Sequence, residues 1–136
     1  MKRIVEKESS IQQACTDMLL LDGWRVLHTD LKHLRGMGVQ EPGIADDLFI
    51  RYWTGCINQI EKTPPYESWA QVLFIEWKRI DPRGLRTKAS QKQKDWHTLE
   101  RKRGALTLIA GQDFEPTTEG FKNWYVNSGL MRNKIL

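Results

Sequence analysis

Hydrophobic residues recur along parts of the chain with the period of an α-helix. Apolar side chains at positions 11, 14, 15, 18 and 19 share one helix face, which predicts an amphipathic helix from about Val5 to Leu21. A second helix is predicted from Lys88 to Arg103, because Gly104 ends the pattern. Its expected inward face consists of Ala89, Gln93, Trp96 and Leu99. A short last helix after Thr117-Thr118 is marked by Phe121, Trp124 and Tyr125.

Four other segments have the shorter, apolar-rich pattern of β-strands. They are residues 24–28, 46–52, 71–75 and 105–110. The first three follow one another and can pair antiparallel, whereas a helix separates the third from the fourth, so a crossover should place these two parallel. We therefore expect an α/β fold with an αβββαβ order, in which helices flank a mixed four-stranded sheet.

A carboxylate and an ammonium group interrupt the end of the third predicted strand. Alternate residues of a strand share a face, so Glu76 and Lys78 should project together while Ile75 and Trp77 point the other way. Burying two charges beside a core is costly unless they pair, bind a metal or take part in chemistry. The pair is therefore either a structural ion pair or a catalytic one.

Length and composition indicate one folded domain. The chain has 136 residues with 40% hydrophobic content and six Trp, which suits a single domain over 1–136, with a core over about 5–110 and a C-terminal helix and tail over 111–136. No apolar run has the length of a membrane span or of a signal peptide, so we expect a cytoplasmic protein. Cys15 and Cys56 lack metal-ligand spacing and are expected in the core and in a loop.

Positive charge is concentrated in one segment. Residues 78–103 contain ten Lys or Arg and three Asp or Glu, a net charge of +7 against +4 for the whole chain. Such a concentration suits a polyanion, and phosphate groups of DNA are its simplest partners, although a solvated helix face would look the same. The candidate DNA-binding residues are Arg79, Arg83, Arg86, Lys88, Lys92 and Lys94.

Acidic residues stand at the ends of several predicted elements. They are Glu8, the adjacent Asp46 and Asp47, and Glu76. Carboxylates gathered at one sheet edge favour a hard cation, Mg²⁺ or Mn²⁺, which can activate water and polarise a phosphate. Lys78 would then orient the water or neutralise the transition state. Simpler roles exist: an aspartate can bound a strand, and Glu8 would be favoured by the helix dipole in a first turn.

The order of these motifs resembles a known nuclease family. Gly43-Ile44-Ala45-Asp46, Glu76-Trp77-Lys78, the spaced residues Ser90, Gln93 and Trp96, and Gly104-Ala105 follow one another along the chain. This arrangement is similar to the virus-type replication-repair nuclease (VRR-NUC) family of the PD-(D/E)xK superfamily. The family's first helix carries a Glu and, four residues on, a Gln, which Glu8 and Gln12 match. The resemblance covers about residues 5–110.

The resemblance implies a restriction-endonuclease-like core and specific roles. It places a Mg²⁺ or Mn²⁺ on Asp46, Glu76 and the carbonyl of Trp77, with Lys78, Gln93 and Glu8 completing the catalytic set. Two departures are present, because Ala45 stands where the family has Pro and Asp47 where it has an apolar residue. The choice between Asp46 and Asp47 is therefore open. The connection between the second and third strands is also longer than expected.

The expected function is hydrolysis of DNA phosphodiester bonds by a metal-dependent endonuclease. The resemblance implies a phage or bacterial DNA-repair protein that acts as a homodimer on branched DNA, such as four-way (Holliday) junctions. Two alternatives use the same features: a non-catalytic nucleic-acid-binding module and a sequence-specific restriction-type nuclease of the same fold. A third is an α/β domain with a structural or partner-binding role.

The remaining candidate residues have simpler expected roles. Trp96 is expected in the core rather than as a platform for base stacking. His28, His33 and His97 lack zinc-site spacing and are expected at the surface or in packing. His28 could nevertheless approach the cleft, because it lies at the end of the first predicted strand.

Overall fold

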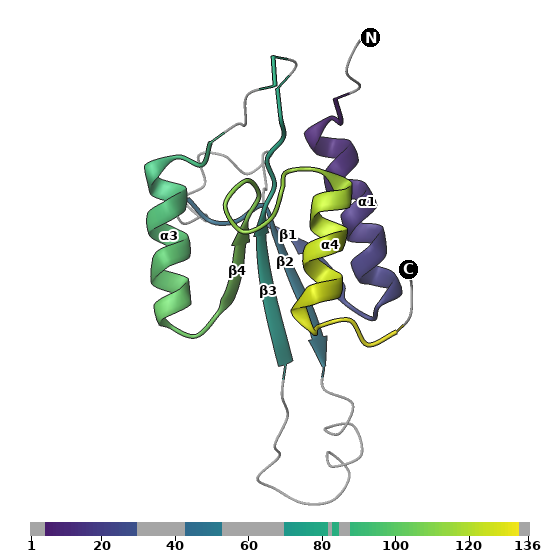
Figure 1. Cartoon of the computed structure of the whole chain (residues 1–136). Coiled ribbons are helices and arrows are strands. Elements are labelled where there is room, and N and C mark those ends of the chain that lie inside the picture. The colour runs from purple at the N-terminus through teal and green to yellow at the C-terminus, as the bar shows by residue number, and fades with distance from the viewer. Residues whose placement is uncertain (1–4, 30–42, 53–69, 82, 85–87, 134–136) are drawn as a thin grey trace, which may run out of the picture.

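The chain forms an α/β fold with a mixed sheet between helices (Figure 1). The computed structural model describes residues 5–29, 43–52, 70–81, 83–84 and 88–133. Its elements are α1 (Glu8–Leu21), β1 (Arg25–His28), β2 (Asp47–Tyr52), β3 (Ala70–Glu76), α3 (Gln91–Lys102), β4 (Leu106–Ile109) and α4 (Thr118–Ser128). The predicted order of helices and strands is confirmed, and most boundaries shift by one to three residues.

The two predicted long helices start later than their patterns suggested. The α1 helix begins at Glu8 rather than Val5, since Lys7 is its extended N-cap residue. The α3 helix begins at Gln91 rather than Lys88, because the Ser90 side chain caps it by accepting a hydrogen bond from the Gln93 N–H. Prediction from apolar spacing alone overlooked this cap, which the Ser-x-x-Gln pattern could have indicated.

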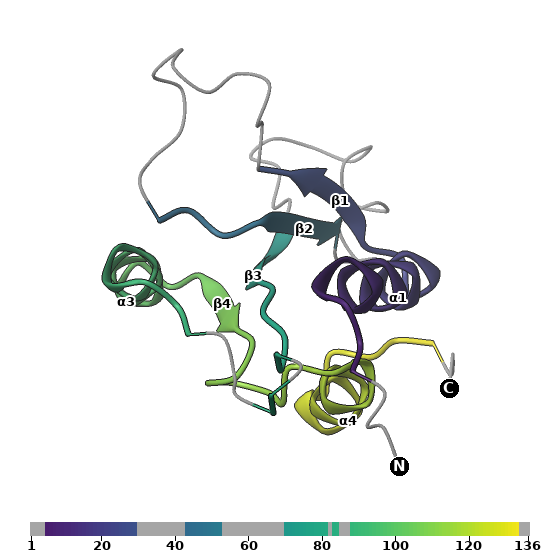
Figure 2. The same ribbon diagram turned by 90° about the horizontal axis from the view of Figure 1, so that it is seen from above.

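The sheet has the strand order β1-β2-β3-β4. The first three strands pair antiparallel and β4 pairs parallel to β3, as predicted. Seen from above, α3 covers one face of the sheet, while α1 and α4 lie side by side on the other (Figure 2). The sheet therefore separates two helical layers.

The main core lies between the sheet and the α1–α4 pair. Leu73, Ile75 and Trp77 are fully buried there, as the strand alternation predicted. They pack with residues of both helices, including Ile11, Cys15, Leu19, Phe121 and Tyr125. The prediction for Cys15 is thus confirmed, whereas Cys56 lies outside the described residues. Because α4 contributes two fully buried aromatic rings, it completes this core rather than forming an appendage.

The inward face of α3 differs from the predicted one. Trp96 is buried and meets the Phe74 ring edge-on at 5.0 Å, which confirms its place in packing. Leu99, however, is 48% exposed, and His97 is buried instead. With about 100° between successive helical residues, a face centred between Trp96 and His97 puts Leu99 on the flank. The prediction for Leu99 was therefore wrong.

A buried polar network joins the end of α1 to the C-terminal part of the chain. Asp22 accepts hydrogen bonds from the Tyr125 hydroxyl and from the backbone N–H groups of Arg132 and Asn133 at 3.0 and 2.7 Å. Arg51 lies 3.3 Å from the same carboxylate and stacks over the Trp24 ring. These contacts fasten the chain after α4 to α1 and the sheet.

The start of α4 is joined to the chain before α1. Glu6 accepts a hydrogen bond from the Thr118 N–H at 3.0 Å.

None of the helices in the described part of the chain has the length and apolar character needed to cross a membrane.

Candidate active site

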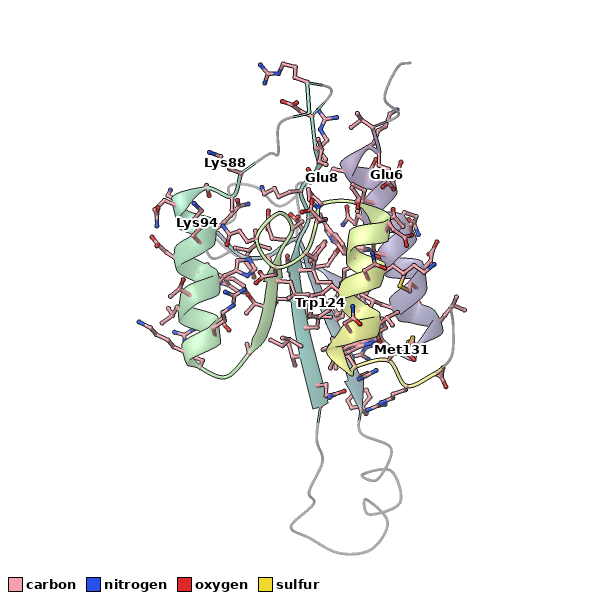
Figure 3. All side chains as sticks on the ribbon, in the orientation of Figure 1. Glu6, Glu8, Lys88, Lys94, Trp124 and Met131 are labelled. Carbon is pink, nitrogen blue, oxygen red and sulfur yellow. The ribbon has the colours of Figure 1, made fainter. Side chains whose placement is uncertain are left out.

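Several polar residues meet at the end of the sheet where β3 stops and β2 begins. In the antiparallel β2–β3 ladder, Asp47 is level with Ile75, so Asp46 comes level with Glu76. The first turns of α1 and α3 lie at this same end, where Figure 3 labels Glu8 on α1 and Lys94 on α3. The topology therefore brings four segments that are distant in sequence to one place.

Asp46 lies at this end in a largely desolvated position. Its Oδ2 accepts a hydrogen bond from the Trp77 N–H at 2.9 Å, which ties it to the chain just beyond β3. Burial raises the pKa of Asp46 to about 6, and the nearby Glu8 carboxylate adds to the rise. The Trp77 N–H and the Lys78 ammonium oppose it without cancelling it. Ionising Asp46 without a bound cation therefore costs more free energy here than it would in water.

Glu76 is still more confined, with only 2% of its surface exposed. Its Oε1 accepts from Gln93 Nε2 at 2.5 Å and lies 3.3 Å from Lys78 Nζ. Its Oε2 is buried and has no hydrogen-bond partner among the described residues. Burial and the Asp46 carboxylate raise the pKa of Glu76 to about 7, although Lys78 lowers it. Thus Oε1 has two partners, Gln93 and Lys78, whereas Oε2 has none among the described residues.

Asp47 occupies a different environment from its neighbour. It is fully buried, and its Oδ2 accepts from Gln12 Nε2 at 2.8 Å and Trp77 Nε1 at 2.7 Å. Its Oδ1 lies 2.5 Å from His28 Nδ1. Successive strand residues point to opposite sides, so Asp46 is grouped with Glu76 and Lys78 while Asp47 binds side chains from the other side. The surroundings of Asp46 and Asp47 therefore differ, although the sequence pattern left the choice between them open.

Gln93 links α3 to the site. Its backbone N–H and side-chain oxygen form a reciprocal capping box with Ser90, at 3.2 and 2.9 Å. Its side-chain Nε2 donates to Glu76. Gln93 was predicted to face inward and does so, and the Ser-x-x-Gln-x-x-Trp spacing now has a physical basis: Ser90 caps the helix, Gln93 holds Glu76 and Trp96 packs on the sheet.

Gly43 explains how the chain before β2 approaches α3. Its φ of +82° is in the left-handed region, and a Cβ there would lie 2.3 Å from the Lys92 carbonyl oxygen. Only glycine allows this contact without displacing backbone. The Gly43-to-Asp46 segment is thereby seated against the first turn of α3, next to Gln93.

Glu8 and Trp77 were the other predicted members of the site. Glu8 is half-buried in the first turn of α1, and its charge raises the pKa values of both Asp46 and Glu76. That electrostatic effect requires proximity to both carboxylates. The Trp77 indole is fully buried in the core, so this residue can offer the site only its backbone.

The predicted DNA-binding residues fall into two groups. Lys88, Lys92 and Lys94 are exposed in or just before the first turn of α3, and Figure 3 labels Lys88 and Lys94 at the same end of the molecule as Glu8. Arg83 is exposed in the turn after β3 but forms an ion pair with Asp81 at 2.9 Å. Arg79 also has an interaction partner, and Arg86 lies outside the described residues. The lysines of α3 are therefore the clearest cationic surface next to the site.

The residues at this site fit a hard divalent cation bound by few protein ligands. Among the described residues, no three His, Cys, Asp or Glu side chains are close enough to hold a metal by themselves. Mg²⁺, however, is commonly bound through one or two carboxylates, with water and substrate phosphate supplying the other oxygens. Two mutually repelling acids and the unpartnered Oε2 of Glu76 suit that mode of binding.

Two polar contacts of the structure were not anticipated from the sequence, although the burial of His97 agrees with packing, one of its two expected roles. His97 is buried between α3 and β4 with its Nδ1 against the Thr107 hydroxyl. Asp47 is the centre of a buried hydrogen-bond network rather than a spare ligand. Neither has a local sequence signal, since each depends on which residues the fold brings opposite it.

Searches against protein-family models, curated proteins and solved structures found no match to this chain.

Proposed function

We propose that the chain is a metal-dependent DNA endonuclease with a VRR-NUC-like core of the PD-(D/E)xK type. The observation that carries this proposal is the grouping of Asp46, Glu76 and Lys78 at one end of the sheet, with Gln93 bound to Glu76. The resemblance of their spacing to that family supports the same assignment. The exposed lysines at the start of α3, at the same end of the sheet, would supply the positive charge that binding a DNA backbone needs.

In this proposal the carboxylates form the metal-binding part of the site. Asp46 and Glu76, with the carbonyl of Trp77, would hold Mg²⁺ or Mn²⁺. When bound, the cation would lower the pKa of a water molecule and stabilise charge on the phosphodiester. Gln93 would keep Glu76 in its orientation through the 2.5 Å hydrogen bond.

Lys78 has a separate role in the proposal. Its ammonium group repels a cation, so it would orient the attacking water or neutralise the negative charge that develops on the phosphate. The exposed lysines at the start of α3 would contact phosphates on one side of the cut. Because such contacts read backbone shape rather than base sequence, branched DNA such as a four-way junction is the proposed substrate class, with a homodimer cutting both strands.

A purely structural ion pair between Glu76 and Lys78 is less consistent with the contacts. In such a pair we expect the carboxylate to have a lowered pKa and both oxygens bound. Glu76 instead has a raised pKa, and its Oε2 has no partner within the described part of the chain. A DNA-binding module without catalysis would likewise gain nothing from acidic groups next to phosphate.

The test is a cleavage assay with four labelled substrates: a four-way junction, a linear duplex, a flap and a single strand. We expect cleavage with Mg²⁺ or Mn²⁺, none in EDTA, and preference for the junction. Full activity in EDTA would overturn the metal mechanism, and DNA binding without cleavage under all conditions would overturn the nuclease assignment. Lys78→Met should lose turnover while keeping metal binding, and normal turnover would assign Lys78 to structure.

A further inference from the structure

His28 is held in a fixed orientation by a buried carboxylate. Its Nδ1 lies 2.5 Å from Oδ1 of Asp47, and 63% of the His28 side chain is exposed, against none of Asp47. An ionised carboxylate can only accept hydrogen bonds, so Nδ1 of His28 is the donor in this contact. Because Nδ1 is engaged by a fully buried carboxylate, we infer that the exposed part of the side chain includes the Nε2 side of the ring.

The His28 ring lies at the same end of the sheet as the candidate active site, on the face that carries Asp47. His28 and Asp47 are partners in the β1–β2 ladder, at the end of the sheet where Asp46 meets Glu76. The residue after His28 donates its backbone N–H to the Asp46 carbonyl oxygen at 3.0 Å. The two adjacent aspartates thus have different neighbours: Asp47 binds the His28 imidazole, and Asp46 lies near Glu76.

Asp47 is itself held from several directions. Gln12 of α1 and the Trp77 indole both donate to its Oδ2, at 2.8 and 2.7 Å. The carboxylate cannot rotate without breaking these bonds, so the orientation of the imidazole is set in advance. An exposed donor with a preset orientation costs less conformational entropy on binding a ligand than a free lysine does.

We propose that His28 is a substrate-binding residue whose Nε2 donates a hydrogen bond to a DNA phosphate flanking the scissile one. The inference rests on the proposed function, because it assumes a nucleic-acid ligand at this end of the sheet. Phosphate is the favoured partner, because an anion at Nε2 stabilises the doubly protonated form of the ring, in which both nitrogens donate. The lysines of α3 would serve the opposite flank, so that phosphates are held on both sides of the carboxylates.

Two substitutions separate this role from support of Asp47. In His28→Asn the amide nitrogen takes the position of Nδ1 and keeps the bond to Asp47, but the outward nitrogen is lost. In His28→Gln the amide nitrogen reaches the position of Nε2 and the bond to Asp47 is lost. The matched control is Arg25→Gln, which removes a cation from the exposed residue at the other end of β1.

Binding is measured by fluorescence anisotropy with a labelled four-way junction and Mg²⁺, in a Glu76→Gln background that prevents cleavage. We expect His28→Asn to melt like its parent yet to bind about tenfold more weakly, as the loss of one charge-assisted hydrogen bond implies. His28→Gln should melt at a lower temperature and retain more affinity than His28→Asn. The Arg25→Gln control should change affinity by less than about twofold.

Equal affinity of His28→Asn and its parent would overturn the inference. Failure of the inference and failure of the proposed function are distinguishable. If the wild-type protein cleaves DNA and His28→Asn binds and cleaves normally, the function stands and the inference falls. If the wild-type protein never cleaves but His28→Asn weakens binding as expected, the phosphate contact stands and the nuclease assignment falls.

Discussion

Two buried carboxylates, Asp22 after the C-terminal end of α1 and Glu76 of β3 near its N-terminal end, have very different hydrogen-bond partners. Asp22, just beyond the helix, accepts from Tyr125, Arg132 and Asn133 and lies beside Arg51. Burial raises its pKa, but these donors outweigh burial and the pKa is lowered. Glu76, near the start of α1, has a raised pKa and an oxygen for which the residues that the structure describes offer no partner.

The difference indicates which end contributes stability and which retains reactive groups. Donors on every side offset the desolvation cost of a buried anion, so that removing its charge destabilises the fold, whereas a buried anion with an unmet acceptor costs free energy. Unmet groups of this kind are concentrated at functional sites. The comparison therefore supports the end of the sheet near Glu76 as the active site and the Asp22 network as a structural anchor.

The largest expected effect is on catalysis at the Glu76 end. Asp46→Asn keeps the side-chain volume but weakens metal binding, so we expect cleavage to fall by about a thousandfold or more. Asp47→Asn is the informative comparison, because Asp47 lies in the hydrogen-bond network and should act mainly through stability. Cleavage rates and melting temperatures are measured for both. A dead Asp47→Asn with a normal melting temperature, alongside an active Asp46→Asn, would reverse the assignment.

At the other end, Asp22→Asn should act on stability. Loss of the charge leaves Arg51, which is 3% exposed, without its buried partner, and we expect the free energy of unfolding to fall by about 3 kcal/mol. Urea denaturation measures the change. Asp17→Asn, at an exposed position of the same helix bonded to Gln13, is the matched control and should cost less than about 0.5 kcal/mol. A similar small loss for Asp22→Asn would remove the distinction between the two ends.

Metal-free stability should depend on pH through Glu76. A folded-state pKa raised from 4.5 to about 7 contributes stability that is fully present below pH 4.5 and is lost as pH rises through 7. Relative to Glu76→Gln, the wild-type protein in EDTA should therefore lose up to about 3 kcal/mol between pH 4.5 and 8.

Subtracting the free energies of unfolding of Glu76→Gln removes the contributions of groups whose stability changes with pH in the opposite direction. Burial lowers the pKa of His97 from 6.5 to about 4, so its contribution falls as pH decreases through this range in both proteins. Urea denaturation in EDTA at several pH values gives the difference. Glu100→Gln, whose carboxylate has the Arg103 partner at 2.7 Å, is the control. Parallel pH profiles for wild-type protein and Glu76→Gln would contradict the raised pKa.

The smallest effect is expected at Gln93. Gln93→Ala removes the bond to Glu76 and one half of the capping box, and we expect cleavage to fall about tenfold with a loss of stability of about 1 kcal/mol. Ser90→Ala removes the side-chain cap but leaves the bond to Glu76. It should match the loss of stability and keep most of the activity. Equal activities for the two variants would reduce Gln93 to a capping residue.

Much of this architecture could be predicted because its signals are local. Strand alternation placed Ile75 and Trp77 in the core and grouped Glu76 with Lys78, and the strand-helix-strand order predicted the parallel pairing of β3 and β4. Helix boundaries were less accurate because apolar spacing does not report caps. Leu99 was misplaced because the inward face of α3 depends on the surface against which it packs.

The sequence alone determined the order of elements, the buried face of each strand and the residue types available for chemistry, since these follow from side-chain periodicity within a few residues. Only the tertiary structure decided that Asp46 joins Glu76 while Asp47 holds His28, and that Asp22 receives donors from the far end of the chain. The physical reason is that burial, hydrogen-bond partners and pKa are properties of an environment. That environment is assembled from segments up to 111 residues apart, and no local pattern contains it.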